Sequence, residues 1–124
     1  MSNIYLIENN RSFHQLFQRI LELNGHKVVG CADNYPECIK DINRLEKLPD
    51  FIIINQQEAV DNYKEVVEQL LKMNPEFRII LMSSNGLAKK AKFENGAAVL
   101  VVKKPFSIKG LHSSIDLLNN PTIS

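Results

Sequence analysis

The sequence predicts a doubly wound α/β domain, in which five parallel strands in the order 2-1-3-4-5 carry two helices on one face and three on the other. Five short apolar runs alternate with amphipathic segments along the 124 residues, a length that suits one hydrophobic core. The connections are short, and a strand–helix–strand connection in such a sheet is right-handed. The run at residues 51–54 is apolar on both faces, which is typical of a central parallel strand.

The first strand is expected at residues 3–7, where an apolar run ends in polar residues. Ser12 is the expected N-cap of the first helix, and Gly25 is its expected end. Between them, apolar side chains recur at helical spacing and form the expected core stripe: Phe13, Leu16, Phe17, Ile20 and Leu23.

The second strand is expected at residues 27–32, and Pro36 suits the first turn of the helix that follows. This helix should end before Pro49, and its apolar stripe consists of Cys38, Ile42 and Leu45. After the third strand, at residues 51–54, we expect a helix at residues 63–73 and a fourth strand at residues 78–82.

A short, lysine-rich helix is expected from about residue 87 to residue 94, before a fifth strand at residues 99–102. Ser107 is the expected N-cap of the last helix, whose apolar stripe consists of Ile108, Leu111, Ile115 and Leu118. The domain is therefore expected to span residues 1–118, followed by a frayed tail at residues 119–124.

Composition excludes several classes of function. The formal net charge is +1, so no global field favours nucleic acid. The longest apolar run, residues 97–102, is too short to span a membrane. The N-terminus lacks a basic segment followed by an apolar stretch, so we expect a cytoplasmic protein. Cys31 and Cys38 are expected to be reduced thiols, with a disulfide or a metal site as the less favoured alternatives.

Polar residues follow the strands at the edge of the sheet where ligands bind in folds of this kind. They are Glu8, Asn9, Asn55, Ser83 and Lys104. Asn55 is the most informative of them because it ends the most hydrophobic strand. A carboxylate at that position could accept a phosphoryl group and hold a divalent cation, whereas an amide is a poor nucleophile without charge.

Over residues 3–118, the chain with these polar residues resembles the receiver domains of two-component response regulators. Those domains have the flavodoxin-like (CheY-like) fold. The segment PDFIIIN at residues 49–55 is similar to the family's third strand, which ends in the aspartate that is phosphorylated. The resemblance implies that Glu8 and Asn9 occupy the two positions of the family's magnesium-binding acidic residues, and that Gln57 occupies the position whose backbone carbonyl binds the metal. It also implies that Ser83 occupies the position of the hydroxyl that contacts the phosphoryl group. Lys104 and Pro105 then correspond to the family's lysine and the cis-proline that follows it.

The resemblance also implies that the family's chemistry is lost. Asn9 replaces a metal ligand and Asn55 replaces the phosphoacceptor, which leaves Glu8 as the only matched carboxylate. Magnesium normally binds carboxylates together with phosphate oxygens, so magnesium binding is expected to be lost or weak. We expect no other cofactor and no enzymatic activity.

The family's aromatic switch position is occupied here by an aliphatic residue. It corresponds to Val101 if the Lys-Pro pair anchors the comparison, or to Leu100 if Gly96 does. The aromatic side chain that reports phosphorylation is therefore missing. The segment from Ser83 to Gly96 is shorter than in the family, which implies a truncated fourth helix and leaves the register of residues 84–103 open.

Two side chains at the expected site have alternative interpretations. Lys104 either pairs with Glu8 and closes the site without a metal, or is a solvated loop lysine. Ser83 either holds a small anion or bonds to nearby backbone, which is the more common role of a serine at a strand end.

Lysines concentrate around the expected fourth helix, fifth strand and fifth helix. They are Lys89, Lys90, Lys92, Lys103, Lys104 and Lys109. In receiver domains this face carries dimerisation and output contacts, so the resemblance implies an acidic protein partner or a homodimer. A solvated charged face is the alternative. Nucleic acid is disfavoured because no arginine accompanies these lysines.

Three functions remain. The favoured one is a stand-alone pseudo-receiver, which acts in signal transduction as a protein interaction module without phosphorylation. The second is a working receiver that uses Glu8 or a serine as the acceptor. The third is a small-molecule binder, which is disfavoured because no glycine-rich phosphate loop follows the first strand. The sequence does not specify the partner or the pathway.

Overall fold

The computed structural model describes residues 2–83 and 99–103. Within these residues, five parallel strands form one sheet in the order β2-β1-β3-β4-β5. They are β1 (Asn3–Ile7), β2 (Lys27–Ala32), β3 (Phe51–Ile54), β4 (Arg78–Ser83) and β5 (Val99–Lys103). The predicted strands, their order and their parallel direction are confirmed, and β4 and β5 each extend one residue beyond the predicted end.

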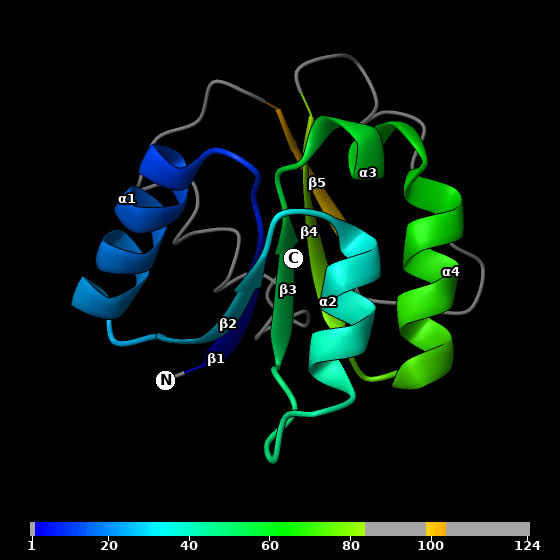
Figure 1. The fold of residues 1–124 in the computed structure, drawn as a ribbon, viewed down its shortest axis with the longest axis horizontal. Helices are drawn as coiled ribbons and strands as arrows, with labels where there is room; N and C mark the ends of the chain where they lie inside the picture. The colour runs from blue at the N-terminus through cyan, green and yellow to red at the C-terminus, as the bar shows by residue number, and fades with distance from the viewer. Residues whose placement is uncertain (1, 84–98, 104–124) are drawn as a thin grey trace, which may run out of the picture.

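Four helices are described: α1 (Arg11–Leu23), α2 (Tyr35–Ile42), α3 (Gln57–Asp61) and α4 (Tyr63–Met73). Of these, α1 lies on one face of the sheet, and the other three cover the opposite face (Figure 1). This agrees with the predicted two-sided arrangement. The helices predicted at residues 87–94 and 108–118, and the tail at residues 119–124, lie outside the described residues.

Side chains of the central strand enter a core on each side of the sheet. Ile52 and Ile54 pack with residues of α2, α3 and α4, whereas Phe51 and Ile53 pack with α1. All four are fully buried. A continuous apolar run is what a strand covered on both faces requires, and the prediction for residues 51–54 is confirmed.

The two cysteines lie on opposite faces of the sheet. Cys31 packs against the core under α1, and Cys38 belongs to the core under α2. Both thiols are free, as predicted, and the disulfide alternative is wrong. Burial, together with the nearby Asp41 carboxylate, raises the pKa of Cys38 to about 12 and that of Cys31 to about 11.

The side chain of Tyr5 extends from β1 past Gly30 of β2 and reaches α2. The pairing of β1 with β2 shifts register after Ile4, so that Tyr5 lies opposite Gly30. A Cβ atom at Gly30 would lie 2.5 Å from Cε2 of Tyr5. The Tyr5 hydroxyl donates a 2.7 Å hydrogen bond to Oδ2 of Asp41 on α2. Burial and this bond raise the pKa of Tyr5.

The predicted N-cap of α1 is wrong. The cap is Asn10, whose backbone is extended and whose Oδ1 accepts a hydrogen bond from the Phe13 N–H at 3.1 Å. Ser12 lies inside the first turn instead. Asn10 takes this role because its own N–H donates to the carboxylate of Glu8 at 2.9 Å. The predicted end at Gly25 is confirmed, with φ at 85°.

Two other helices differ from the prediction. The helix α2 ends at Ile42, so Leu45 lies beyond it, where it still packs against the core. The helix α3 was not predicted, because five residues are too few to show a helical period.

The predicted core stripe of α1 is only partly correct. Of the predicted residues, Phe17 is buried and Ile20 is half-buried, but Phe13, Leu16 and Leu23 are 48%, 54% and 78% exposed. Leu21, which the prediction did not include, is buried as well. Helical spacing identifies an apolar face, but it does not show whether another element covers all of that face.

Candidate functional site

The carboxyl ends of the parallel strands bring three polar side chains to one edge of the sheet. Glu8 follows β1, Asn55 follows β3, and Ser83 ends β4. Their side chains are 3%, 7% and 0% exposed. Ile7 pairs with Ile54, so Glu8 and Asn55 leave neighbouring strands together. Ile54 also pairs with Leu81, so β4 ends at the same edge with Ser83, and the predicted grouping of the three residues follows from these pairings.

The Glu8 carboxylate accepts hydrogen bonds at both of its oxygens. Oε2 accepts from the side-chain amide of Asn55, and Oε1 accepts from the backbone N–H of Asn10 at 2.9 Å. A buried carboxylate needs such donors to offset the loss of water. Glu8 therefore connects the end of β3 to the N-cap of α1.

The carbonyl oxygen Oδ1 of Asn55 is buried and has no hydrogen-bond partner among the described residues. A buried acceptor that lacks a donor costs about 1–3 kcal/mol. This oxygen lies on the same amide group that binds Glu8. An amide oxygen beside a carboxylate forms an environment that favours a hydrogen-bond donor or a positive charge.

Two residues at predicted metal-binding positions, Asn9 and Gln57, are exposed, unlike the buried side chains of Glu8, Asn55 and Ser83. Asn9 is exposed. Gln57 is the exposed first residue of α3, and its side-chain amide donates to Oδ1 of Asp61 at 2.8 Å. Among the described residues, no group of three or more histidine, cysteine, aspartate or glutamate side chains is arranged to hold a metal ion.

Sequence reasoning missed Asn10 and Gln56. The side chain of Gln56 is buried at the site edge, and its Oε1 accepts a hydrogen bond from the Ala59 N–H at 3.1 Å, which caps α3. The available signal was a polar residue three positions before Ala59, the spacing at which a side chain caps a helix. With this cap, only two residues, Asn55 and Gln56, separate the end of β3 from the start of α3.

The last strand leads to the same edge. Ser83 pairs with Lys103, and Leu81 pairs with Val101, so β5 ends beside β4. Lys104 and Pro105 follow directly in the sequence but lie outside the described residues, as do Lys89, Lys90, Lys92 and Lys109. The backbone of Val101 lies in β5; its assignment to the switch position stays a prediction.

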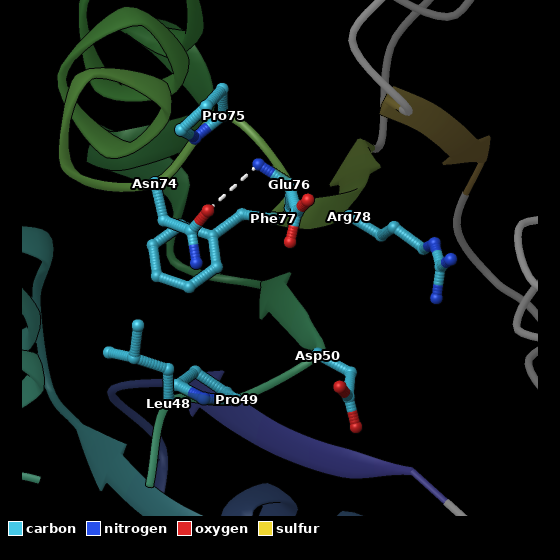
Figure 2. Close-up of a pocket in the computed structure, with 8 residues that line it drawn as sticks. All are labelled: Leu48, Pro49, Asp50, Asn74, Pro75, Glu76, Phe77 and Arg78. Carbon is cyan, nitrogen blue, oxygen red and sulfur yellow. Dashed lines mark hydrogen bonds between the residues drawn. The ribbon is translucent and has the colours of Figure 1, made fainter.

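The groove shown in Figure 2 lies at the other end of the strands. Its volume is about 490 Å³, and it is lined by Leu48, Pro49, Asp50, Asn74, Pro75, Glu76, Phe77 and Arg78. Asp50 is used structurally there, because its Oδ2 accepts the Asn3 N–H at 2.8 Å. No predicted site residue lines this groove. Among the described residues, no helix has the length and apolar character needed to cross a membrane.

The family model of the response regulator receiver domain matches residues 4–116 of the chain. No curated protein matches it. Among solved structures, the chain is similar to a response regulator receiver domain protein from Clostridium thermocellum, with 19% identity and a TM-score of 0.77; the match covers 99% of this chain and 98% of that one.

Two further solved structures have the same fold. A DNA-binding response regulator of the LuxR family from Staphylococcus aureus is 20% identical, with a TM-score of 0.74 and coverage of 97% of this chain and 100% of that chain. A mutant of the anti-anti-sigma factor PhyR from Bartonella quintana is 19% identical, with a TM-score of 0.72. That match covers 99% of this chain and 50% of the other, so this chain spans about half of its length.

Proposed function

Because the chain belongs to the response regulator receiver domain family, we propose that it is a pseudo-receiver, an interaction module of signal transduction that works without phosphorylation. One observation supports this proposal above the others. The residue at the expected acceptor position is Asn55, and its amide is bound to the buried carboxylate of Glu8.

An amide in this position is unsuited to phosphoryl transfer. The carboxylate of an acceptor attacks phosphorus through an oxygen that carries negative charge, whereas the nitrogen lone pair of an amide is delocalised. The Asn55 nitrogen also uses an N–H to donate to Glu8. We therefore propose that the natural chain forms no phosphoryl adduct at Asn55.

We propose that the site does not hold magnesium at millimolar concentrations. Its one carboxylate, from Glu8, already accepts an N–H at each oxygen. Asn9 is exposed, and Gln57 lies in a helix, where first-turn carbonyls accept helical N–H groups. A divalent cation would have to displace the Asn55 amide and would gain a single negative charge.

We propose that the ammonium group of Lys104 takes the place of the cation. Glu8 supplies a negative charge, and the buried Oδ1 of Asn55 has no donor among the described residues. Strand β5 ends opposite Ser83, one residue before Lys104 in the sequence. An ammonium group donates to both acceptors and neutralises the carboxylate, which would close the site permanently.

The alternative acceptors have less support. Glu8 is 3% exposed and its two oxygens are occupied, and Ser83 is fully buried. Docking of an acidic partner on the lysine-rich face, or a homodimer through it, remains a proposal, since β5 is the only part of that face described.

The proposal is tested by incubating the full chain with acetyl phosphate and magnesium and then measuring intact mass. We expect no phosphoryl adduct on the natural chain. The variant Asn9→Asp with Asn55→Asp serves as the matched control, because it restores carboxylates at both substituted positions. A stoichiometric adduct on the natural chain, lost when Glu8 or a serine is replaced, would instead establish a receiver with a non-standard acceptor.

A further inference from the structure

The turn that joins α1 to β2 (Figure 1) contains Asn24 followed by Gly25, which is the one asparagine–glycine pair among the described residues. Both residues are exposed. Gly25 has a φ of 85°, and a Cβ atom added to it would have no atom within 4 Å. The peptide group that follows Asn24 therefore lies in an open turn with no side chain next to it.

An asparagine followed by glycine can lose its side-chain amide without an enzyme. The backbone nitrogen of the glycine gives up its proton and bonds to the side-chain carbonyl carbon Cγ, while the bond from Cγ to Nδ2 breaks and ammonia leaves. The product is a cyclic succinimide. Water then opens the ring at either of its carbonyl carbons and leaves aspartate or isoaspartate, so water is consumed and ammonia is released. A Cβ atom on the attacking residue hinders this approach, and glycine has none.

Asn62 is a structural match for Asn24. Each ends a helix in nearly the same backbone conformation, with φ and ψ of −97° and 17° for Asn24 and of −106° and 32° for Asn62. Each donates its backbone N–H and its Nδ2 to the carbonyl oxygen four residues earlier, at 3.2 Å and 2.8 Å for Asn24 and at 3.2 Å and 2.9 Å for Asn62. Both are exposed. The residue that follows differs, because Asn62 precedes Tyr63, the first residue of α4.

The folded turn occupies both of the groups that would react. The side-chain amide of Asn24 is bound to the carbonyl of Ile20, and the Gly25 N–H is bound to the carbonyl of Glu22 at 3.1 Å. Both bonds have to break before the Gly25 nitrogen can reach Cγ. Helix ends open locally at a small cost in free energy, so these bonds slow the reaction without preventing it.

We propose that Asn24 is a site of spontaneous deamidation in the native chain, and that opening of the last turn of α1 sets the rate. The co-reactant is water. Asn62 stays intact because the nitrogen that would attack belongs to Tyr63, whose side chain packs against the core. The inference does not depend on the proposed function.

Deamidation should destabilise the end of α1. A carboxylate at position 24 cannot donate to the carbonyl of Ile20, and the helix macrodipole disfavours a negative charge at this end. The last turn has no basic residue to offset that charge, and it already carries Glu22. Isoaspartate also adds a methylene to the backbone before His26, whose N–H bonds to the carbonyl of Leu21 at 3.0 Å. The reaction would thus loosen the connection from α1 to β2 as the protein ages.

The test incubates the full chain in mildly alkaline buffer made with water enriched in the heavy oxygen isotope, followed by peptide mapping with mass spectrometry. Each succinimide that opens takes up a labelled oxygen. Mapping separates Asn24 from the pairs Asn85–Gly86 and Asn95–Gly96, which lie outside the described residues. We expect label at Asn24 and none at Asn62. Labelling of Asn24 should be about tenfold faster in urea, where the turn no longer has to open.

Variants separate the chemistry from the stability of the turn. Gly25→Ala should slow labelling in buffer and in urea alike, although it strains a position with positive φ and so loosens the turn. Asn24→Asp imitates the product and should lower the melting temperature. Asn62→Asp is its matched control, because it loses the same kind of cap bond but places its charge at the start of α4, where the macrodipole favours it.

Several outcomes would overturn the proposal. They are an unlabelled Asn24 in the folded chain while urea permits labelling, equal labelling of Asn24 and Asn62, equal rates at Asn24 with and without urea, and faster labelling in Gly25→Ala. A melting temperature of Asn24→Asp that is no lower than that of Asn62→Asp would refute the effect on α1. All of these results are independent of the mass measurement that tests for a phosphoryl adduct.

Discussion

Asn55 donates its side-chain amide to the carboxylate of Glu8, and the two residues lie at the adjacent ends of β3 and β1. Both are buried, so this bond is made where water does not compete with it. A neutral donor thus satisfies a buried charge, and the interaction depends on the residue at position 55 being an amide rather than a carboxylate.

The single change Asn55→Asp should lower the free energy of unfolding by about 1–3 kcal/mol near pH 7, because it replaces the donor with a second negative charge. Urea denaturation of the variant and of the natural chain measures this difference. Asn9→Asp, at an exposed position, is the control and should change stability little. A loss for Asn55→Asp no larger than that for Asn9→Asp would contradict the contact with Glu8.

Combining Asn9→Asp with Asn55→Asp should create a magnesium site. Three carboxylates repel one another until a cation joins them, so the ion-free double variant should melt below the natural chain. Magnesium should recover part of that loss because it binds only the folded state. Thermal melting with and without magnesium is the measurement, and Asn9→Asp alone should not respond. If the double variant has the same melting temperature with and without magnesium, the three carboxylates do not form a common magnesium site.

Gly30→Ala should destabilise the chain by about 1–3 kcal/mol, as overpacking of a core typically does. The new Cβ would lie 2.5 Å and 2.8 Å from two ring carbons of Tyr5, and 3.3 Å from the Asp41 carboxylate. Removing the ring with Tyr5→Leu should make the glycine change less costly. A double-mutant cycle from urea denaturation measures this coupling, and strictly additive effects would show that the ring can move aside.

The buried thiol of Cys38 should make the chain less stable in alkali. Its pKa is raised to about 12 in the folded state, so its contribution is complete below the unfolded value of 9.0 and is lost as the pH rises through the folded value. Cys38→Ala should therefore flatten the decline in unfolding free energy between about pH 9 and pH 12. Cys31→Ala, at a half-buried position, should flatten it less. An unchanged slope in Cys38→Ala would assign the decline to other groups, of which Tyr5 is one.

The strands could be predicted from the sequence because each is a local apolar signal. The run at residues 51–54 has no polar residue, which is typical of a strand covered on both faces. The N-cap of α1 could not be predicted in the same way. Asn10 and Ser12 are both good capping residues, and the choice depends on Glu8, which holds the Asn10 N–H.

By itself, the sequence determined the sheet, its order and the edge at which Glu8, Asn55 and Ser83 meet, because these follow from alternation, short connections and parallel strand ends. Only the tertiary structure decided which atoms of these residues bind one another and which apolar residues of α1 stay exposed. The physical reason is that hydrophobic periodicity is encoded within one segment. A hydrogen bond between two strand ends, or the cover over a helix face, depends on segments that are far apart in the chain.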